Sequence, residues 1–351
     1  FSRTAAQYVS EGTLRELRAL VDKSLLQHTP SARYEVHELL RQYGAEKLCS
    51  LPDAATEVSD RHCAYYVAAL QRWAADLTGV RQLAALVEME AENGNISAAW
   101  TWAVGRGQIE RLDIAMGGLE HYYWQIGRYQ EGEAALRAAG AAAAAVVESA
   151  ADRAACLRVW VRALAWQSNF QRAMGQRDSA QQLQQQCLVI LQDPSLAGTD
   201  TRLERGVLSW SMGATVCMED YAQGRQRFEE SYSLFRVLDH RWGMAWALNT
   251  WGTMSIFLGA YSDARQRLEE GVSIYRALGN ASGIAGCVSS LAWIAMAGGR
   301  FQEAERLARE GVATARQGSI RTELAYALLN LGEVLESAGK FSEAHTVLQQ
   351  S

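Results

Sequence analysis

The sequence predicts an all-α protein whose larger part is a solenoid of helical hairpins with a repeat of about 40 residues. Three observations support this fold class. The chain has 351 residues but only 3 prolines, which favours helices joined by short turns. A short phrase recurs at a nearly constant spacing through residues 112–351. Apolar residues also keep the same phase in successive units, as the buried face of a helix requires.

The recurring phrase reads glycine, any residue, an aromatic residue, two further residues and alanine. It occurs in full at residues 259–264, 299–304 and 339–344. Relaxed copies occupy residues 127–132, 175–180 and 221–224. The third positions are residues 129, 177, 221, 261, 301 and 341, so the spacings are 48, 44, 40, 40 and 40. Such a constant period is the signature of a repeat architecture.

Apolar and small residues stand at fixed distances from the glycine of each phrase. Eleven, eight and seven residues before it lie Leu248, Trp251 and Gly252 in one unit, Val288, Leu291 and Ala292 in the next, and Leu328, Leu331 and Gly332 in the last. After the turn, Tyr261, Ala264, Leu268 and Val272 form a second stripe. Each unit is therefore predicted to be a hairpin of two antiparallel helices, with the glycine ending the first helix.

This pattern resembles the tetratricopeptide repeat over roughly residues 112–351. The family unit has about 34 residues, so the helices here are expected to be longer. The longer variant, carried by residues 277–304, resembles repeats in the sensor arms of signalling ATPases. The resemblance implies a right-handed superhelix of about six hairpins. The last hairpin stops at Ser351 without a polar capping helix, so we expect the array to continue.

The front of the chain does not fit the repeat. The stretches LRALVDKSLLQ (17–27) and RYEVHELLRQYGAEKL (33–48) read as helix, strand, turn, strand and helix. The strands are expected at Leu25–Leu26 and Tyr34–Val36, around a turn at residues 28–32. These stretches resemble the C-terminal part of the winged-helix domain of the signal transduction ATPases with numerous domains, the STAND class.

The resemblance assigns a role to one histidine. In the STAND class a Met-His-Asp-like motif opens the last helix of the winged-helix domain, and its histidine contacts the β-phosphate of ADP. The corresponding triplet here is Val36-His37-Glu38, so the resemblance puts His37 in that role in the parent protein. The alternative is a structural histidine at the start of a helix.

Two further blocks extend the resemblance. DRHCAYYVAALQRWAADL (60–77) and EMEAENGNISAAWTWAV (88–104) are similar to the linker helices of bacterial members, and YYWQIGRYQEGEAAL (122–136) to their entry into the repeats. The expected domains are residues 1–50 from the winged helix, a helical linker at 51–111 and the repeats at 112–351. The resemblance implies ADP or ATP as the parent's cofactor, held by a nucleotide-binding domain, and no cofactor in this chain.

The sequence offers no catalytic or metal-binding motif. It lacks a phosphate-binding Gly-x-x-x-x-Gly-Lys loop, a His-Glu-x-x-His helix and a Gly-x-Ser-x-Gly elbow. The six cysteines form no Cys-x-x-Cys pair, which indicates free thiols in a cytoplasmic protein. The net charge of -5 argues against nucleic-acid binding, and no apolar run reaches the ~20 residues of a membrane span. We therefore expect a chain that is not itself an enzyme.

The candidate binding residues follow from the repeat. In stacked hairpins the first helices line the concave face, and the phase from each turn glycine predicts which side chains point there. The predicted groove residues are Trp124, Trp166, Asn169, Arg172, Trp210, Trp246, Asn249, Trp293, Tyr326 and Asn330. Tryptophans with amide neighbours suit a ligand with apolar faces and polar edges, such as a peptide, a protein segment, a sugar chain or another small molecule. The alternative is that some of these tryptophans are core.

Three functions remain open on the sequence. The first is a sensor arm whose ligand shifts the parent from a closed ADP state to an open, oligomerising ATP state. The second is a constitutive scaffold that holds one partner protein. The third is the regulatory module of a transcription activator whose front domain contacts DNA. The front helix argues against DNA, because acidic side chains offset its basic ones: Glu35, Glu38 and Glu46 against Arg33, Arg41 and Lys47.

Overall fold

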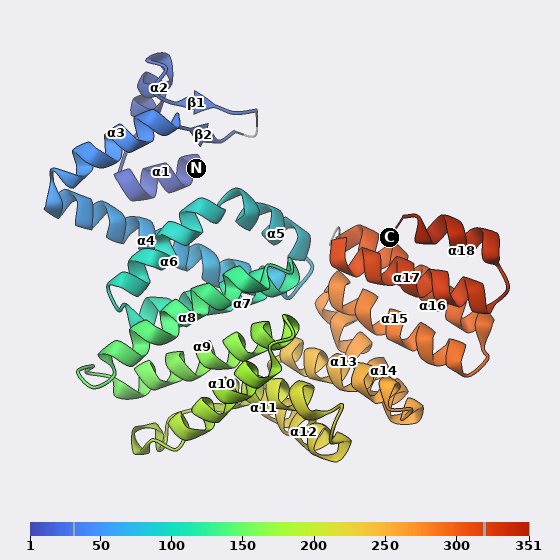
Figure 1. The fold of residues 1–351 in the computed structure, drawn as a ribbon. Coiled ribbons are helices and arrows are strands. Elements are labelled where there is room, and N and C mark those ends of the chain that lie inside the picture. The colour runs from blue at the N-terminus through green and yellow to red at the C-terminus, as the bar shows by residue number, and fades with distance from the viewer. Residues whose placement is uncertain (31, 319–320, 351) are drawn as a thin grey trace. The chain divides into compact units, whose positions relative to one another are not determined.

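The structure, a computed structural model, describes residues 1–30, 32–318 and 321–350. Ser31, in the expected turn, and Ser351 lie outside these ranges. The described residues form eighteen α-helices, a short 3-10 turn at Pro194–Leu196 and one two-stranded sheet (Figure 1). The all-α prediction is thus confirmed. Two compact units can be distinguished, residues 1–73 with 87–118, and residues 74–86 with 119–351.

The first unit begins with a small helical domain that includes the sheet. Its elements are α1 (Arg3–Ser10), α2 (Leu14–Asp22), β1 (Gln27–His28), β2 (Tyr34–Glu35) and α3 (Glu38–Cys49). Helices α4 (Pro52–Leu77), α5 (Gln82–Ala91), α6 (Asn93–Gly105) and α7 (Ile109–Gln125) follow. The end of α4, the start of α5 and the end of α7 belong to the second unit. Leu17, Leu26 and Tyr34 form a buried apolar cluster that joins α2 to the sheet.

The first strand begins two residues later than predicted. Ser24 adopts a left-handed conformation with φ 58°, and the amides of Leu25 and Leu26 both donate to the carbonyl of Leu20. These bonds satisfy the C-terminal carbonyl of α2, as a helix end requires. The backbone of Leu25 and Leu26 therefore caps α2 instead of pairing as a strand, and strand pairing starts at Gln27, opposite Glu35.

A buried carboxylate ties the second strand to the long helices of the first unit. Glu92 accepts hydrogen bonds from Arg33 at 2.6 Å, from the Tyr66 hydroxyl at 2.8 Å and from Asn95 at 2.7 Å. Burial alone would raise the pKa of Glu92, but these donors outweigh it and lower the pKa. The charged form of Glu92 thus fixes the segment before β2 against α4 and α6.

The second unit is a succession of antiparallel hairpins (Figure 1). From α7 onward, each odd-numbered helix and the next one form a pair. These helices are α8 (Tyr129–Val146), α9 (Arg153–Ala173), α10 (Arg177–Ile190), α11 (Arg202–Val216), α12 (Tyr221–Val237), α13 (Arg241–Phe257), α14 (Tyr261–Leu278), α15 (Ala281–Ala297), α16 (Phe301–Gly318), α17 (Arg321–Ser337) and α18 (Phe341–Leu348).

The turn glycines end the first helices as predicted. Gly259 has φ 75°, its amide donates to the carbonyl of Ile256, and the next amide, of Ala260, donates to Ser255. This pair of bonds is the Schellman motif, which needs a left-handed residue that glycine adopts without strain. Gly299 and Gly339 make the same pair of bonds in the next two hairpins.

The predicted apolar stripe of the first helices is buried. Leu248, Trp251, Val288 and their counterparts at 291, 328 and 331 all have less than a tenth of their surface exposed. A Cβ atom at Gly252 would lie 2.6 Å from Cγ of Leu268, so the small residue does permit the close approach of α14. The stripe of the second helices differs at Tyr261, which is 40% exposed because it opens α14 at the end of the hairpin.

Two glycines of one hairpin provide a stability test of this packing. Gly252→Ala is expected to lower the free energy of unfolding by about 1–3 kcal/mol, because the new methyl overlaps Leu268. Gly271→Ala, whose Cβ would meet Leu248 at an ordinary 3.4 Å, is expected to raise it by up to about 1 kcal/mol through helix propensity. Urea unfolding followed by circular dichroism checks both. Equal effects at the two positions would contradict the close approach.

Candidate ligand pocket

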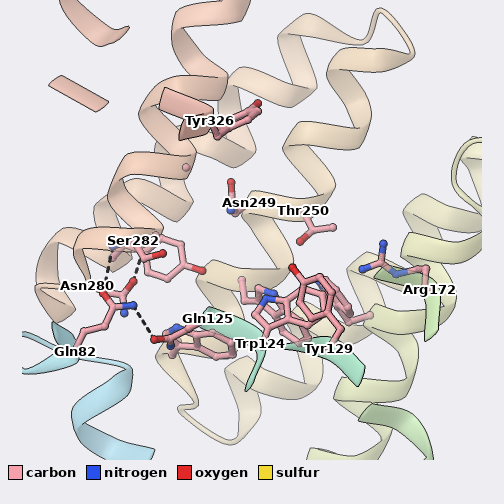
Figure 2. Close-up of a pocket in the computed structure, with 16 residues that line it drawn as sticks. Gln82, Trp124, Gln125, Tyr129, Arg172, Asn249, Thr250, Asn280, Ser282 and Tyr326 are labelled. Carbon is pink, nitrogen blue, oxygen red and sulfur yellow. Dashed lines mark hydrogen bonds between the residues drawn. The ribbon is translucent and has the colours of Figure 1, made fainter. Parts of the chain in front are cut away.

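A pocket of about 340 Å³ lies within the second unit (Figure 2). Most of its wall comes from the first helices of successive hairpins, α7, α9, α11, α13, α15 and α17. The start of α5 and single residues of α8 and α14 complete it. The lining residues are Gln82, Trp124, Gln125, Tyr129, Arg172, Trp210, Trp242, Trp246, Asn249, Thr250, Tyr275, Asn280, Ser282, Gly283, Gly286 and Tyr326.

Tryptophans from four helices meet at one side of this pocket. Trp246 of α13 stacks on Trp210 of α11 with ring centroids 3.7 Å apart, and on Trp166 of α9 at 5.4 Å. Trp242 stacks on Trp246 at 5.3 Å, while Trp124 of α7 meets it edge-on at 6.2 Å. Offset stacks and edge-to-face contacts are the favourable arrangements for aromatic rings. The first helices of four hairpins are therefore joined by aromatic contacts along their inner faces.

A polar network closes the opposite side of the pocket. The Gln82 amide donates to Oε1 of Gln125 at 3.1 Å, and the Gln125 amide donates to the carbonyl of Leu77 at 3.2 Å. The Asn280 amide donates to the same carbonyl at 3.3 Å, across more than 200 residues of sequence. All three side chains are buried, so these bonds replace the water that the groups would otherwise need. The α4–α5 loop is thus held against the start of α15.

The start of α15 already has its hydrogen-bond acceptors. Oδ1 of Asn280 accepts from the amide of Gly283 at 2.8 Å, and Oε1 of Gln82 accepts from the amide of Ser282 at 3.3 Å. Gly279, with φ 70°, lies so close to Val80 that a Cβ atom would approach its side chain to 2.1 Å. The two loops are therefore in direct contact, and the first amides of α15 are engaged within the protein.

Other polar groups of the pocket wall have no partner in the part of the chain that the structure describes. These groups are Oδ1 of Asn249, Nε of Arg172 and Nε1 of Trp210, all buried. The Arg172 guanidinium lies over the Trp210 ring, 5.1 Å from its centroid, and burial lowers its pKa. Buried polar atoms are nearly always hydrogen-bonded. A bound molecule or ordered water would satisfy these three.

The structure brings six of the predicted groove residues into one wall. Trp124, Arg172, Trp210, Trp246, Asn249 and Tyr326 all line the pocket. Trp166 and Asn169 lie behind it, with at most 1% of their surface exposed, and Asn330 is also buried. Trp293 is half-buried beside Tyr261, 6.3 Å from its ring centroid. These four stand six or nine residues before a turn glycine, but the phase alone does not exclude them, because Thr250 also stands nine residues before Gly259 and lines the pocket.

His37 lies in the first unit and caps a helix. It is exposed, and its Nδ1 accepts a hydrogen bond from the amide of Leu39 at 3.3 Å at the start of α3. This contact is the structural role expected of a histidine at a helix start. The phosphate-binding role in a parent protein stays a prediction.

Sequence reasoning missed several polar or aromatic lining residues, among them Tyr129 and Tyr275 of the second helices α8 and α14. Trp242 and Ser282 both stand seventeen residues before a turn glycine, one turn beyond the positions considered. Extending the inner stripe by four residues would have found them. Gln82 precedes the repeats and Gln125 follows Trp124 in α7, so the repeat phase gave no signal for either. Asn280 precedes α15 as its cap, outside the helix positions that the repeat phase covers.

Across the residues with described positions, no group of three histidine, cysteine or acidic side chains is arranged to hold a metal ion. Over the same residues, none of the helices has the length and apolar character needed to cross a membrane.

The comparisons with known proteins agree with the hairpin architecture. A family model described as "Tetratricopeptide repeat" matches residues 284–318, the fifth hairpin. The chain is similar to a STAND protein with a tetratricopeptide repeat sensor from Pyrococcus horikoshii, with 13% identity and a TM-score of 0.56. That match covers 100% of this chain and 54% of the other, so this chain spans about half the length of that protein. The fold is therefore a tetratricopeptide-like α-solenoid.

Two other solved structures are similar at lower scores. BtubC from P. vanneervenii is 16% identical with a TM-score of 0.47, over 61% of this chain and 89% of that one. The apo quorum sensor NprR from B. thuringiensis is 13% identical with a TM-score of 0.47, over 98% of both chains. No curated protein matched the sequence.

The closing network can be tested by comparing two helix caps. Asn280→Ala removes the α15 cap and the bond to Leu77, whereas Asp220→Ala removes only the equivalent cap of α12, a 3.0 Å bond to the amide of Gln223. We expect about 0.5–2 kcal/mol of destabilisation from Asp220→Ala. Asn280→Ala should cost roughly 1 kcal/mol more, through the additional buried hydrogen bond.

Hydrogen exchange supplies the sharper readout of this prediction. Asn280→Ala is expected to speed amide exchange at residues 78–82, which the Asn280 side chain helps to hold, while Asp220→Ala leaves it unchanged. Unchanged exchange in both variants would show that the loop does not depend on Asn280.

Proposed function

We propose that the second unit binds a small ligand in the pocket described above, and that this binding is the chain's biochemical function. The observation that carries the proposal is the set of unpartnered polar atoms on Asn249, Arg172 and Trp210, in a wall that is otherwise aromatic. Ligand sites typically combine an apolar lining with a few such polar groups. The tetratricopeptide fold itself is typically non-catalytic, which favours binding over chemistry.

The size of the pocket favours a small molecule or a short peptide over a folded partner. About 340 Å³ lies at the lower end of the roughly 300–1,000 Å³ typical of small-molecule sites. A partner protein would instead need a broad exposed surface of about 800 Å² on this chain. The aromatic contacts among the first helices fill much of the inner face that such a partner would use.

The further role that we propose is that of the sensor arm of a STAND-class ATPase. Support comes from the sequence blocks at residues 17–48, 60–77 and 88–104, which follow the order of that class. The likeness in fold to the Pyrococcus horikoshii protein extends over all of this chain. In this proposal residues 1–50 derive from a winged helix, 51–111 from a linker and 112–351 from the sensor. His37 contacts ADP, and a nucleotide-binding domain of the parent holds the nucleotide.

A ligand in this pocket would act on the closure of the array. The pocket wall includes Gln82 from the α4–α5 loop as well as Ser282 from α15, and these residues already contact each other. A ligand that touches both sides binds the closed arrangement more tightly than an opened one. Such a difference in affinity is what shifts a conformational equilibrium. In this proposal, closure of the array around its ligand is the event that moves the parent protein from a closed ADP state to an open ATP state.

A fluorescence titration tests the binding function. The tryptophans of the wall should report a bound molecule, so libraries of metabolites and of N-acetylated tripeptides are expected to contain members that give a saturable change. Asn249→Leu should weaken that binding about tenfold, because it removes a buried hydrogen-bonding group at constant size. Gln182→Leu, which also replaces an amide side chain by leucine but at an exposed site on α10, serves as the control.

The outcomes distinguish a small-ligand binding function from a scaffold for a protein partner. Weakening by Asn249→Leu alone places the site in the pocket. If neither library gives a saturable change, the small-ligand function is wrong, and a scaffold for a protein partner becomes the better reading.

A further inference from the structure

One arginine of α9 lacks the acidic partner that the other arginines of this helix have. Arg158 pairs with Glu204 at 2.9 Å, Arg162 with Glu120 at 2.7 Å and Arg153 with Asp193 at 3.0 Å. The side chain of Arg172, on the same helix, forms no ion pair with any residue in the described ranges, and its Nε has no hydrogen-bond partner among them. Its Nε is buried all the same. A buried N–H donor without an acceptor is costly, and a bound molecule at this position would supply the acceptor.

The pocket wall supplies no counter-charge for Arg172. Of the described residues that line the pocket, none is aspartate or glutamate, and Arg172 is the single charged one. The Trp210 ring below the guanidinium offers a cation–π contact but no hydrogen-bond acceptor. This contact with Trp210 orients the plane of the guanidinium, and it leaves the N–H donors at the edge of that plane available for a ligand. A planar fork of N–H donors matches a carboxylate, which it binds through two parallel hydrogen bonds.

We propose that Arg172 recognises a carboxylate on the ligand, so that the natural ligand is a monocarboxylate with an apolar body. This inference rests on the proposed binding function and adds the chemical class of the ligand. One positive charge in an aromatic wall balances one negative charge. A phosphate dianion would leave an excess charge against Trp210 and Trp246, and burying an unbalanced charge is unfavourable.

The rest of the wall orients such a ligand. Figure 2 shows Arg172 at one side of the pocket and Gln82, Asn280 and Ser282 at the other, with Asn249 and Tyr326 between them. The first amides of α15 do not compete for the carboxylate, because Asn280 and Gln82 already occupy those of Gly283 and Ser282. The carboxylate therefore lies at Arg172, and a neutral polar group of the ligand meets the Asn249 amide.

Matched acid and amide probes test the inference. The complete chain is titrated with an N-acetylated tripeptide library as free C-terminal acids and with the same library as C-terminal amides. Phenylacetate and phenylacetamide form a second pair without a peptide backbone, and inorganic phosphate is the dianion probe. Tryptophan fluorescence reports binding. The best acid is expected to bind about tenfold or more tightly than its amide.

Two arginine variants identify the group responsible. Arg172→Gln is expected to abolish the preference for the acid and to leave amide binding unchanged, while Arg172→Lys keeps a part of the preference. Arg236→Gln is the matched control, because Arg236 also lies over an aromatic ring, that of Tyr232 at 5.9 Å, but outside the pocket. Circular dichroism verifies folding, and the comparison of acid with amide on the unchanged chain does not depend on any variant.

Each outcome decides whether Arg172 recognises a carboxylate on the ligand. A preference for acids that Arg172→Gln removes supports the inference, and the pair of probes that binds tells whether the carboxylate is a peptide terminus or a small aromatic acid. Equal binding of acids and amides, or phosphate binding as tightly as the best acid, overturns the inference and leaves the binding function standing. Binding by neither library overturns both.

Discussion

The aromatic contact between first helices is the interaction on which the second unit depends. In a tetratricopeptide-like array each hairpin needs only its neighbours, so the inner face is normally free. Here Trp246 reaches Trp166 and Trp124, which belong to hairpins two and three units earlier in the chain. The array must therefore curve enough for these rings to touch. The same curvature leaves a pocket beside the tryptophans instead of an open groove.

The polar closure follows from that curvature. Once the inner helices converge, the α14–α15 loop is brought to the α4–α5 loop, and both would bury backbone groups without partners. Asn280 and Gln125 meet this requirement by sharing the Leu77 carbonyl, and Gln82 bonds both Gln125 and the Ser282 amide. Amide side chains suit this place because each carries a donor and an acceptor. The closure is uncharged, so it is insensitive to salt, unlike the exposed ion pairs on the outer helices.

The sequence was sufficient for the hairpins but only partly for the pocket. Turn glycines and apolar stripes are local signals with a fixed period, which is why Gly259, Leu248 and Gly252 were assigned correctly. The phase from the glycine also places Trp246 and Asn249 on the inner face. The repeat phase does not predict how strongly the array curves. That curvature decides that Trp166 and Asn169 are buried rather than exposed to the pocket. Gln82 contacts Ser282 although the two residues are 200 positions apart, and the repeat pattern of the sequence carries no signal for such a contact.

Curvature also explains why one arginine of α9 differs from the others. Arg158 and Arg162 lie at levels of the helix where the neighbouring helices α11 and α7 supply Glu204 and Glu120. Arg172 lies in the last turn of α9, where the adjacent inner surface is the ring of Trp210. An acid at that level would neutralise Arg172 and close the pocket to an anion. The fold tolerates the unpaired charge because the stacked ring, rather than a carboxylate, holds the guanidinium in place, and this leaves its hydrogen-bonding edge for a molecule from outside.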